Sequence, residues 1–121
     1  MTTQAVNIAQ KLDTIESYWD PKIIGELNGQ MVKLAKVKGE FIWHHHETED
    51  ELFLVLKGVL RLELRDGTVI LNPGEMFIVP RGVEHRPVAR EEVHLLLFEP
   101  ASTLNTGNIR SERTVEDLDR I

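Results

Sequence analysis

The sequence predicts an all-β fold, an antiparallel sandwich or barrel with a short helix at its N-terminus. Glycines recur from residue 25 to residue 82 and separate short runs rich in Val, Ile, Leu and Phe. Within these runs, apolar residues alternate with polar ones or follow one another directly, and no helical spacing intervenes. Short strands at this spacing are typical of antiparallel sheets, whereas parallel sheets need helices between their strands.

The composition is that of one globular domain. The chain has 121 residues, of which 41% are hydrophobic and 28% charged, which is typical of a single folded unit. We expect residues 1–20 to form an N-terminal helical segment, residues 21–100 the barrel and residues 101–121 a tail. The net charge of −6 argues against a nucleic-acid partner, and the lack of cysteine excludes disulfides and thiolate metal sites.

The chain has no feature that predicts a membrane or secretory destination. No apolar run approaches the length that crosses a bilayer, and the first residues lack the basic and apolar regions of a signal peptide. We therefore expect a cytoplasmic protein without a membrane partner.

One apolar stripe at helical spacing predicts the N-terminal helix, near residues 7–18. Asn7 is a suitable N-cap, and Pro21 ends the helix at or before the preceding residue. The stripe consists of Ile8, Leu12, Ile15 and Trp19. We expect it to pack against the sheet.

The segment Val59–Arg65 has the clearest strand pattern. Its leucines share one face and its charged residues share the other, which predicts a strand with one buried and one solvated side. Asp66 and Gly67 supply a hairpin turn that leads into a second strand containing Val69 and Leu71.

Two further runs, Leu52–Leu56 and Leu95–Phe98, are apolar at every position. Strands without a polar face are covered on both sides. The barrel interior covers one side, and the N-terminal helix covers part of the other. We expect a second subunit to cover the rest, and hence a homodimer. In the polar tail, Thr114 and Asp117 have the spacing of a capping box, which predicts a last short helix.

The segment around the histidine triplet contains the residues most suited to chemistry. In a strand, residues two apart project to the same face, so His44 and His46 point together and His45 points away. Glu51 opens the next strand after an acidic turn, which allows it to return beside the two histidines. His85 begins a later strand, after a tight turn, and becomes a fourth candidate if it faces inward.

Three neutral imidazoles and one carboxylate suit a divalent transition metal, namely Fe, Mn, Ni, Co, Cu or Zn, with coordination positions left for water or substrate. Two other interpretations remain open. The triplet is also compatible with a solvated polar patch, and Glu51 with a residue that only neutralises a histidine. The sequence identifies no further catalytic residue.

Other positions have weaker patterns. Lys36 projects either into the barrel or, as we prefer, towards water. His45 and His94 are expected at the surface or an interface. Trp43 is expected to pack on the face opposite the ligands, together with Phe41. The residues expected to line the pocket are Ile42, Phe53 and Val55.

Two motifs in this chain resemble those of the cupin superfamily, in particular its small single-domain members. The first motif is matched by Gly39, His44, His46, Glu51 and Gly58, and the second by Gly74, Pro80, Gly82 and His85. Ala89 stands where the second motif usually ends in Asn. The resemblance implies a double-stranded β-helix, or jelly-roll barrel, that holds a metal through His44, His46, Glu51 and His85. It also implies that ligands bind inside the barrel and that dimers are common.

The resemblance leaves the reaction open, because one fold supports many functions. The first hypothesis is a metalloenzyme acting on a small organic molecule: a dioxygenase of an organic acid, enol or phenol, or an isomerase or lyase. The alternative is a module that binds or senses a small molecule through the metal without turnover. A third hypothesis is a purely structural ion.

Overall fold

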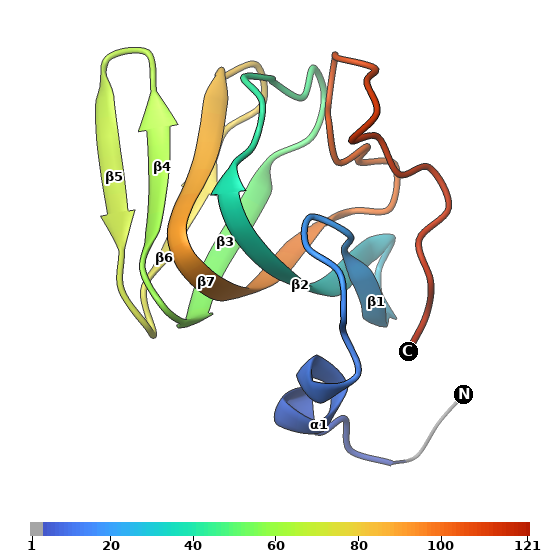
Figure 1. Ribbon diagram of the computed structural model, residues 1–121. Coiled ribbons are helices and arrows are strands. Elements are labelled where there is room, and N and C mark those ends of the chain that lie inside the picture. Colours follow the sequence, from blue (N-terminus) through green and yellow to red (C-terminus); the bar gives the residue numbers. More distant parts are fainter. Residues whose placement is uncertain (1–3) are drawn as a thin grey trace.

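The computed structural model describes residues 4–121 and has the predicted all-β architecture with one short N-terminal helix (Figure 1). The helix is α1 (Ile8–Asp13). The strands are β1 (Lys22–Leu27), β2 (Gln30–Glu40), β3 (Glu51–Lys57), β4 (Leu60–Leu64), β5 (Gly67–Leu71), β6 (Met76–Val79) and β7 (His85–Pro100).

Strand β7 organises the sheet, because it pairs with three other strands. Its C-terminal part lies between β2 and β3, and its N-terminal part pairs with β4, so that it curves across the molecule (Figure 1). The strand order is β1-β2-β7-β3-β6, with the β4–β5 hairpin joined through β7. The concave side encloses a core made mainly of Val and Leu from β2, β3, β4 and β7.

The helix is shorter than the sequence predicts. Asn7 caps it as expected, its side chain accepting a hydrogen bond from the Gln10 amide at 3.0 Å, but the helix ends at Asp13. The apolar stripe is confirmed for its first three members, since Leu12 and Ile15 are buried against Leu34 with Ile8 packed beside them. Trp19 does not belong to this stripe.

Trp19 instead adopts a left-handed backbone conformation with φ of 59°. Its amide donates to the Lys36 carbonyl of β2 at 2.9 Å, and its ring packs against the barrel core. The chain therefore leaves the helix before Trp19 and turns this residue towards the barrel. Lys36 lies on the outer side, where its amine donates to the Ile15 carbonyl at 2.9 Å.

The β4–β5 hairpin confirms the strand pattern seen in the sequence, with Leu60 and Leu62 fully buried. The hairpin turn, however, lies one residue earlier than predicted. Leu64 pairs with Gly67, so Arg65 and Asp66 form the connection and Gly67 already belongs to β5.

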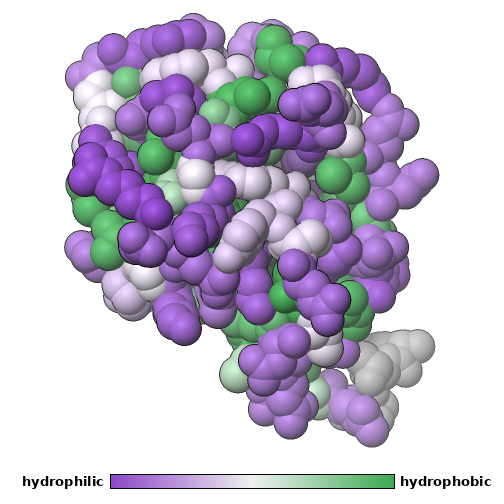
Figure 2. Space-filling view, in the orientation of Figure 1, coloured by the Kyte–Doolittle hydropathy of each residue, from purple (hydrophilic) through white to green (hydrophobic). Residues whose placement is uncertain are grey.

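The outer face of β3, β6 and β7 is apolar across three strands. Leu52 pairs with Phe98 on one side and with Ile78 on the other, and the next row, formed around Leu54, is also apolar. α1 covers the part of this face next to β2, where apolar surface is visible between the helix and the barrel (Figure 2). Away from α1, Ile78 keeps 47% of its surface exposed.

The tail, residues 101–121, contains turns and no helix, so the predicted last helix is wrong. The Thr114 hydroxyl accepts a hydrogen bond from the Ser111 amide and is also hydrogen-bonded to the Thr106 hydroxyl. These hydrogen bonds close a turn at the position of the expected cap. Among residues 4–121, no helix has the length and apolarity that a membrane span requires.

Candidate metal centre

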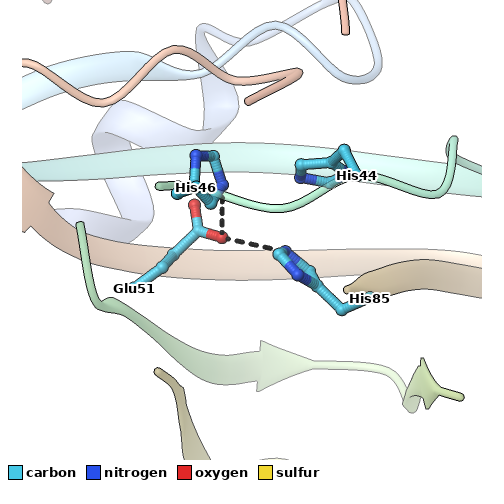
Figure 3. A group of neighbouring side chains, drawn as sticks. All are labelled: His44, His46, Glu51 and His85. Carbon is cyan, nitrogen blue, oxygen red and sulfur yellow. Dashed lines mark ion pairs between the residues drawn. The ribbon is translucent and has the colours of Figure 1, made fainter. Parts of the chain in front are cut away.

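The four candidate ligands come together in the barrel, although they lie on three separate segments of the chain (Figure 3). His44 and His46 belong to the segment after β2, Glu51 is the first residue of β3, and His85 is the first residue of β7. His44 and His85 exchange both backbone hydrogen bonds, at 2.9 and 3.1 Å. This bridge ties the histidine segment to β7 and places the two rings side by side.

The ligand atoms of these four residues lie within 4.8 Å of one another. Glu51 Oε1 is 3.4 Å from His46 Nε2 and 3.4 Å from His85 Nε2. Two ligand atoms that are each about 2.1 Å from one ion are roughly 3.0–3.4 Å apart when they are neighbours. The separations in this cluster therefore match the edges of a coordination sphere.

Hydrogen bonds orient two of the rings. His44 Nδ1 lies 2.9 Å from the Ile42 carbonyl, and His85 Nδ1 lies 3.0 Å from the Val83 carbonyl. A carbonyl only accepts, so each Nδ1 carries the proton and each Nε2 keeps its lone pair for a metal.

The remaining atoms of the cluster lack partners in a way that fits a metal ion. His46 Nε2, His85 Nε2 and Glu51 Oε1 are buried without a hydrogen bond. Unpaired buried polar atoms are costly, and three that converge in one cluster fit a cation held between them. The residues present thus fit a divalent ion.

The protonation states also suit metal binding. Burial, together with the neighbouring His85 ring, lowers the pKa of His44 to about 4, so His44 is neutral at pH 7. Burial alone raises the pKa of the Glu51 carboxyl, but its interactions with the Glu99 carboxyl and with the His46 and His85 rings hold it well below its usual range. Glu51 is therefore the charged member of the set.

A buried ion pair beside Glu51 was not predicted from the sequence. Lys33 Nζ lies 2.8 Å from Glu99 Oε1, and both residues are 2% exposed. Burial and the nearby Glu51 carboxylate raise the pKa of Glu99 well above its usual range. Glu99 therefore holds a proton more strongly than an ordinary glutamic acid, and the Lys33 ammonium compensates the negative charge of the two carboxyl groups. The sequence did contain a signal for the position of Glu99. It lies two and four residues after Leu97 and Leu95, so in a strand all three side chains project to the same face.

A pocket that is open to solvent and has a cavity volume of about 40 Å³ lies next to the cluster and reaches His44 and Glu51. Its walls are mainly apolar and aromatic, as in many small-molecule sites. They include Trp19, Pro21, Ala35, Val37, Phe41, Phe53, Pro87, Leu95, Leu97, Glu99 and Asn105.

The pocket lining confirms the prediction for Phe53 and contradicts it for the two other residues that were expected there. Phe41, predicted on the opposite face, lines the pocket and contacts the edge of His44, with ring centroids 5.4 Å apart. Ile42 does not line it, and Val55 is buried in the core instead. Residues 41–43 are not in a strand, and Gly39 has φ of 89°, so the alternation assumed in the prediction does not extend through this segment.

Three residues predicted to lie outside the ligand set do so. His45 pairs with Glu47 at the surface, and His94 pairs with Glu92. Trp43 packs under the Arg65 guanidinium, whose Cζ is 3.8 Å from the ring centroid.

The comparison with known families agrees with this geometry. A family model described as a cupin domain matches residues 30–99, which include all four candidate ligands. The chain belongs to the cupin family. A cupin-2 domain protein from Shewanella frigidimarina has a similar solved structure, with a TM-score of 0.77 and 42% identity, covering 78% of this cupin and 93% of that chain.

Two curated relatives match this cupin over shorter regions. An uncharacterised Bacillus subtilis protein, YdbB, is 42% identical over 64 residues, which are 52% of this chain and 57% of that protein. The acireductone dioxygenase of Bacillus licheniformis is 34% identical over 71 residues, which are 54% of this chain and 40% of that enzyme. The matched region spans about half the length of these relatives.

Proposed function

We propose that this cupin binds a divalent transition metal through His44, His46, Glu51 and His85, and that it catalyses a dioxygenase-type reaction on a small organic molecule. The observation that supports metal binding is the convergence of four buried ligand atoms, three of which have no other partner. The adjoining pocket supplies space for an organic ligand at the same place.

The bound ion would supply a Lewis acid with coordination positions open to dioxygen or to a substrate oxygen. The chain's own residues set the surroundings. Phe41 and Phe53 make the pocket walls apolar. Glu99, His46 and His85 hold Glu51 in its charged form.

The similarity to an acireductone dioxygenase favours oxygen chemistry over the isomerase or lyase alternative. A dioxygenase transfers both atoms of O₂ to its substrate, and the substrate supplies the four electrons, so no separate reductant is needed. An organic acid, enol or phenol is the substrate class for this proposal.

Metal binding is tested on protein purified without a nickel column. We expect a stoichiometric ion in the purified chain, to be measured by inductively coupled plasma mass spectrometry. His46→Ala removes a ligand and lowers metal affinity about 100-fold or more, whereas His45→Ala leaves it unchanged. Equal losses in the two variants would contradict the ligand assignment.

Turnover is tested with the Fe(II)-loaded protein and an oxygen electrode. We expect O₂ consumption with acireductone or with one member of a panel of organic acids, enols and phenols, and none with Glu51→Gln. Substrate conversion without O₂ consumption would favour the isomerase or lyase alternative, and saturable binding without conversion would favour a sensing module.

We further propose that the protein forms a homodimer through the apolar outer face of β3, β6 and β7. The supporting observation is that Leu52, Leu54, Phe98 and Ile78 form continuous cross-strand rows that α1 does not cover. A contiguous exposed apolar surface of this kind is typical of an interface.

A further inference from the structure

Arg113, in the tail, lies beside the aromatic wall of the pocket. Its guanidinium Cζ is 5.6 Å from the ring centroid of Phe41 and 5.9 Å from that of Trp19. The two rings stack on each other with centroids 4.8 Å apart, and both line the pocket. A cation at this distance is attracted by the ring faces, which holds Arg113 at the pocket wall.

The backbone of Arg113 is fixed to the same wall. Asn105, which lines the pocket, donates from Nδ2 to the Arg113 carbonyl at 2.8 Å. The Asn105 Oδ1 atom accepts from the Val115 amide at 2.9 Å. One pocket residue therefore holds the chain at Arg113 and again two residues later, so that Arg113 is anchored to the pocket at its backbone.

The Arg113 guanidinium differs in its partners from the other two guanidinium groups of the tail. The other two arginines of the tail form ion pairs, Arg110 with Glu116 and Arg120 with Glu26. Within residues 4–121, no carboxylate pairs with Arg113. In a chain of net charge −6, a half-buried cation that has no ion pair and lies against two rings of the pocket wall indicates that an anion completes it.

We propose that Arg113 binds the carboxylate of the ligand, and that this cupin therefore acts on small organic acids. The proposal rests on the proposed function, because the other end of the ligand is expected at the four-residue cluster. A guanidinium matches a carboxylate with two parallel hydrogen bonds, which favours this anion over a neutral group. A divalent ion held by one carboxylate and three neutral imidazoles adds positive charge at the opposite end.

The dimensions limit the ligand to a small acid. Arg113 Cζ lies 5.6 Å from the Phe41 centroid and the Phe41 centroid 5.4 Å from that of His44, so the guanidinium is at most about 11 Å from this imidazole. The ion pair at one end and the metal bond at the other occupy several ångströms of this span. The ligand body between them lies against Phe41 and the apolar wall.

The fluorescence of Trp19 provides a local test. The chain has two tryptophans, and Trp43→Phe leaves Trp19 as the single reporter in the pocket. The metal-loaded variant is titrated with benzoate and with its neutral counterpart benzamide. We expect saturable quenching by benzoate, with an affinity about tenfold or more above that for benzamide.

Substitutions in the same background assign the effect to Arg113. Arg113→Gln lowers benzoate affinity to that of benzamide and leaves benzamide binding unchanged, while Arg113→Lys retains part of the preference for the acid. Arg110→Gln, which removes a tail cation already paired with Glu116, is the matched control and has no effect. Circular dichroism verifies that each variant is folded.

Three results would overturn the proposal: no saturable response to benzoate, equal affinity for benzoate and benzamide, or unchanged benzoate binding in Arg113→Gln. Metal content is measured separately before each titration. A chain that binds no metal contradicts the proposed function, and the same titrations on that metal-free chain still decide the role of Arg113.

Discussion

His44 illustrates how burial prepares a side chain to be a ligand. Its folded-state pKa of about 4 lies below its ordinary value of 6.5, so between these values the unfolded chain takes up a proton that the folded chain does not. Stability is therefore highest above pH 6.5 and falls as the pH decreases towards 4.

We predict that the metal-free protein loses about 3 kcal/mol of unfolding free energy through His44 between pH 7 and pH 4. The measurement is urea denaturation in the presence of a chelator at several pH values. Because Glu51 and Glu99 also titrate, the relevant quantity is the difference between the wild type and His44→Gln. Parallel pH profiles for the two proteins would show that His44 is not buried in its neutral form.

Glu51, Glu99 and Lys33 form a group of interacting buried charges. Glu51 on β3 and Glu99 on β7 are cross-strand neighbours on the inner face, an arrangement that is unfavourable for two like charges. The raised pKa of Glu99 and the Lys33 ammonium reduce this repulsion.

We predict that Lys33→Met destabilises the protein by about 3 kcal/mol, because it leaves a buried negative charge without a partner. Lys38→Met, on the exposed end of the same strand, is the control and changes stability little. If urea denaturation gave equal stabilities for Lys33→Met and Lys38→Met, the Lys33–Glu99 pair would not contribute to the stability of the protein.

At the scale of elements, the tail is hydrogen-bonded to the segment that carries the three consecutive histidines, residues 44–46. The Asn108 amide donates to the His45 carbonyl at 3.0 Å, and the Asn108 side chain accepts from the His45 amide at 2.9 Å. Gly107 permits this close approach, since a Cβ there would lie 2.1 Å from the His45 carbonyl oxygen, and its φ is 57°. The tail thus supports the segment that carries two of the candidate ligands.

We predict that Gly107→Ala lowers stability by about 2 kcal/mol or more, from backbone strain and the clash together. It also weakens metal binding, because His45 lies between His44 and His46. Gly67→Ala is the matched control, since a Cβ at that position meets nothing within 4 Å. The checks are thermal denaturation and metal titration. Unchanged metal affinity in Gly107→Ala would mean that the tail does not support the site.

At the scale of the whole molecule, the uncovered outer face determines the expected assembly. We predict a dimer by sedimentation velocity at micromolar concentration. Ile78→Glu places a charge in the apolar rows and weakens association about tenfold or more. Ile70→Glu, at a residue of similar exposure on β5, leaves association unchanged. A monomeric wild type would contradict the proposed interface.

The sequence by itself determined the all-β class and, through its resemblance to the cupins, predicted that His44, His46, Glu51 and His85 meet in one cluster. The physical reason is local. The period-two alternation assigns residues of a strand to a face, so Glu51 and Phe53 were correctly placed together, and the Pro80–Gly82 turn returns the chain so that His85 begins the next strand.

Tertiary structure alone decided the rest of the pocket. The inward position of Lys33, the rotation of Phe41 into the pocket and the approach of Trp19 and Asn105 depend on contacts between segments far apart in the chain. Lysines occur on both faces of β2, so alternation did not identify the inner one. Residues 41–43 and the tail lack regular structure, so contacts with distant segments place their side chains, as the stacking of Phe41 on Trp19 and the hydrogen bond from the Phe41 amide to the Pro87 carbonyl show.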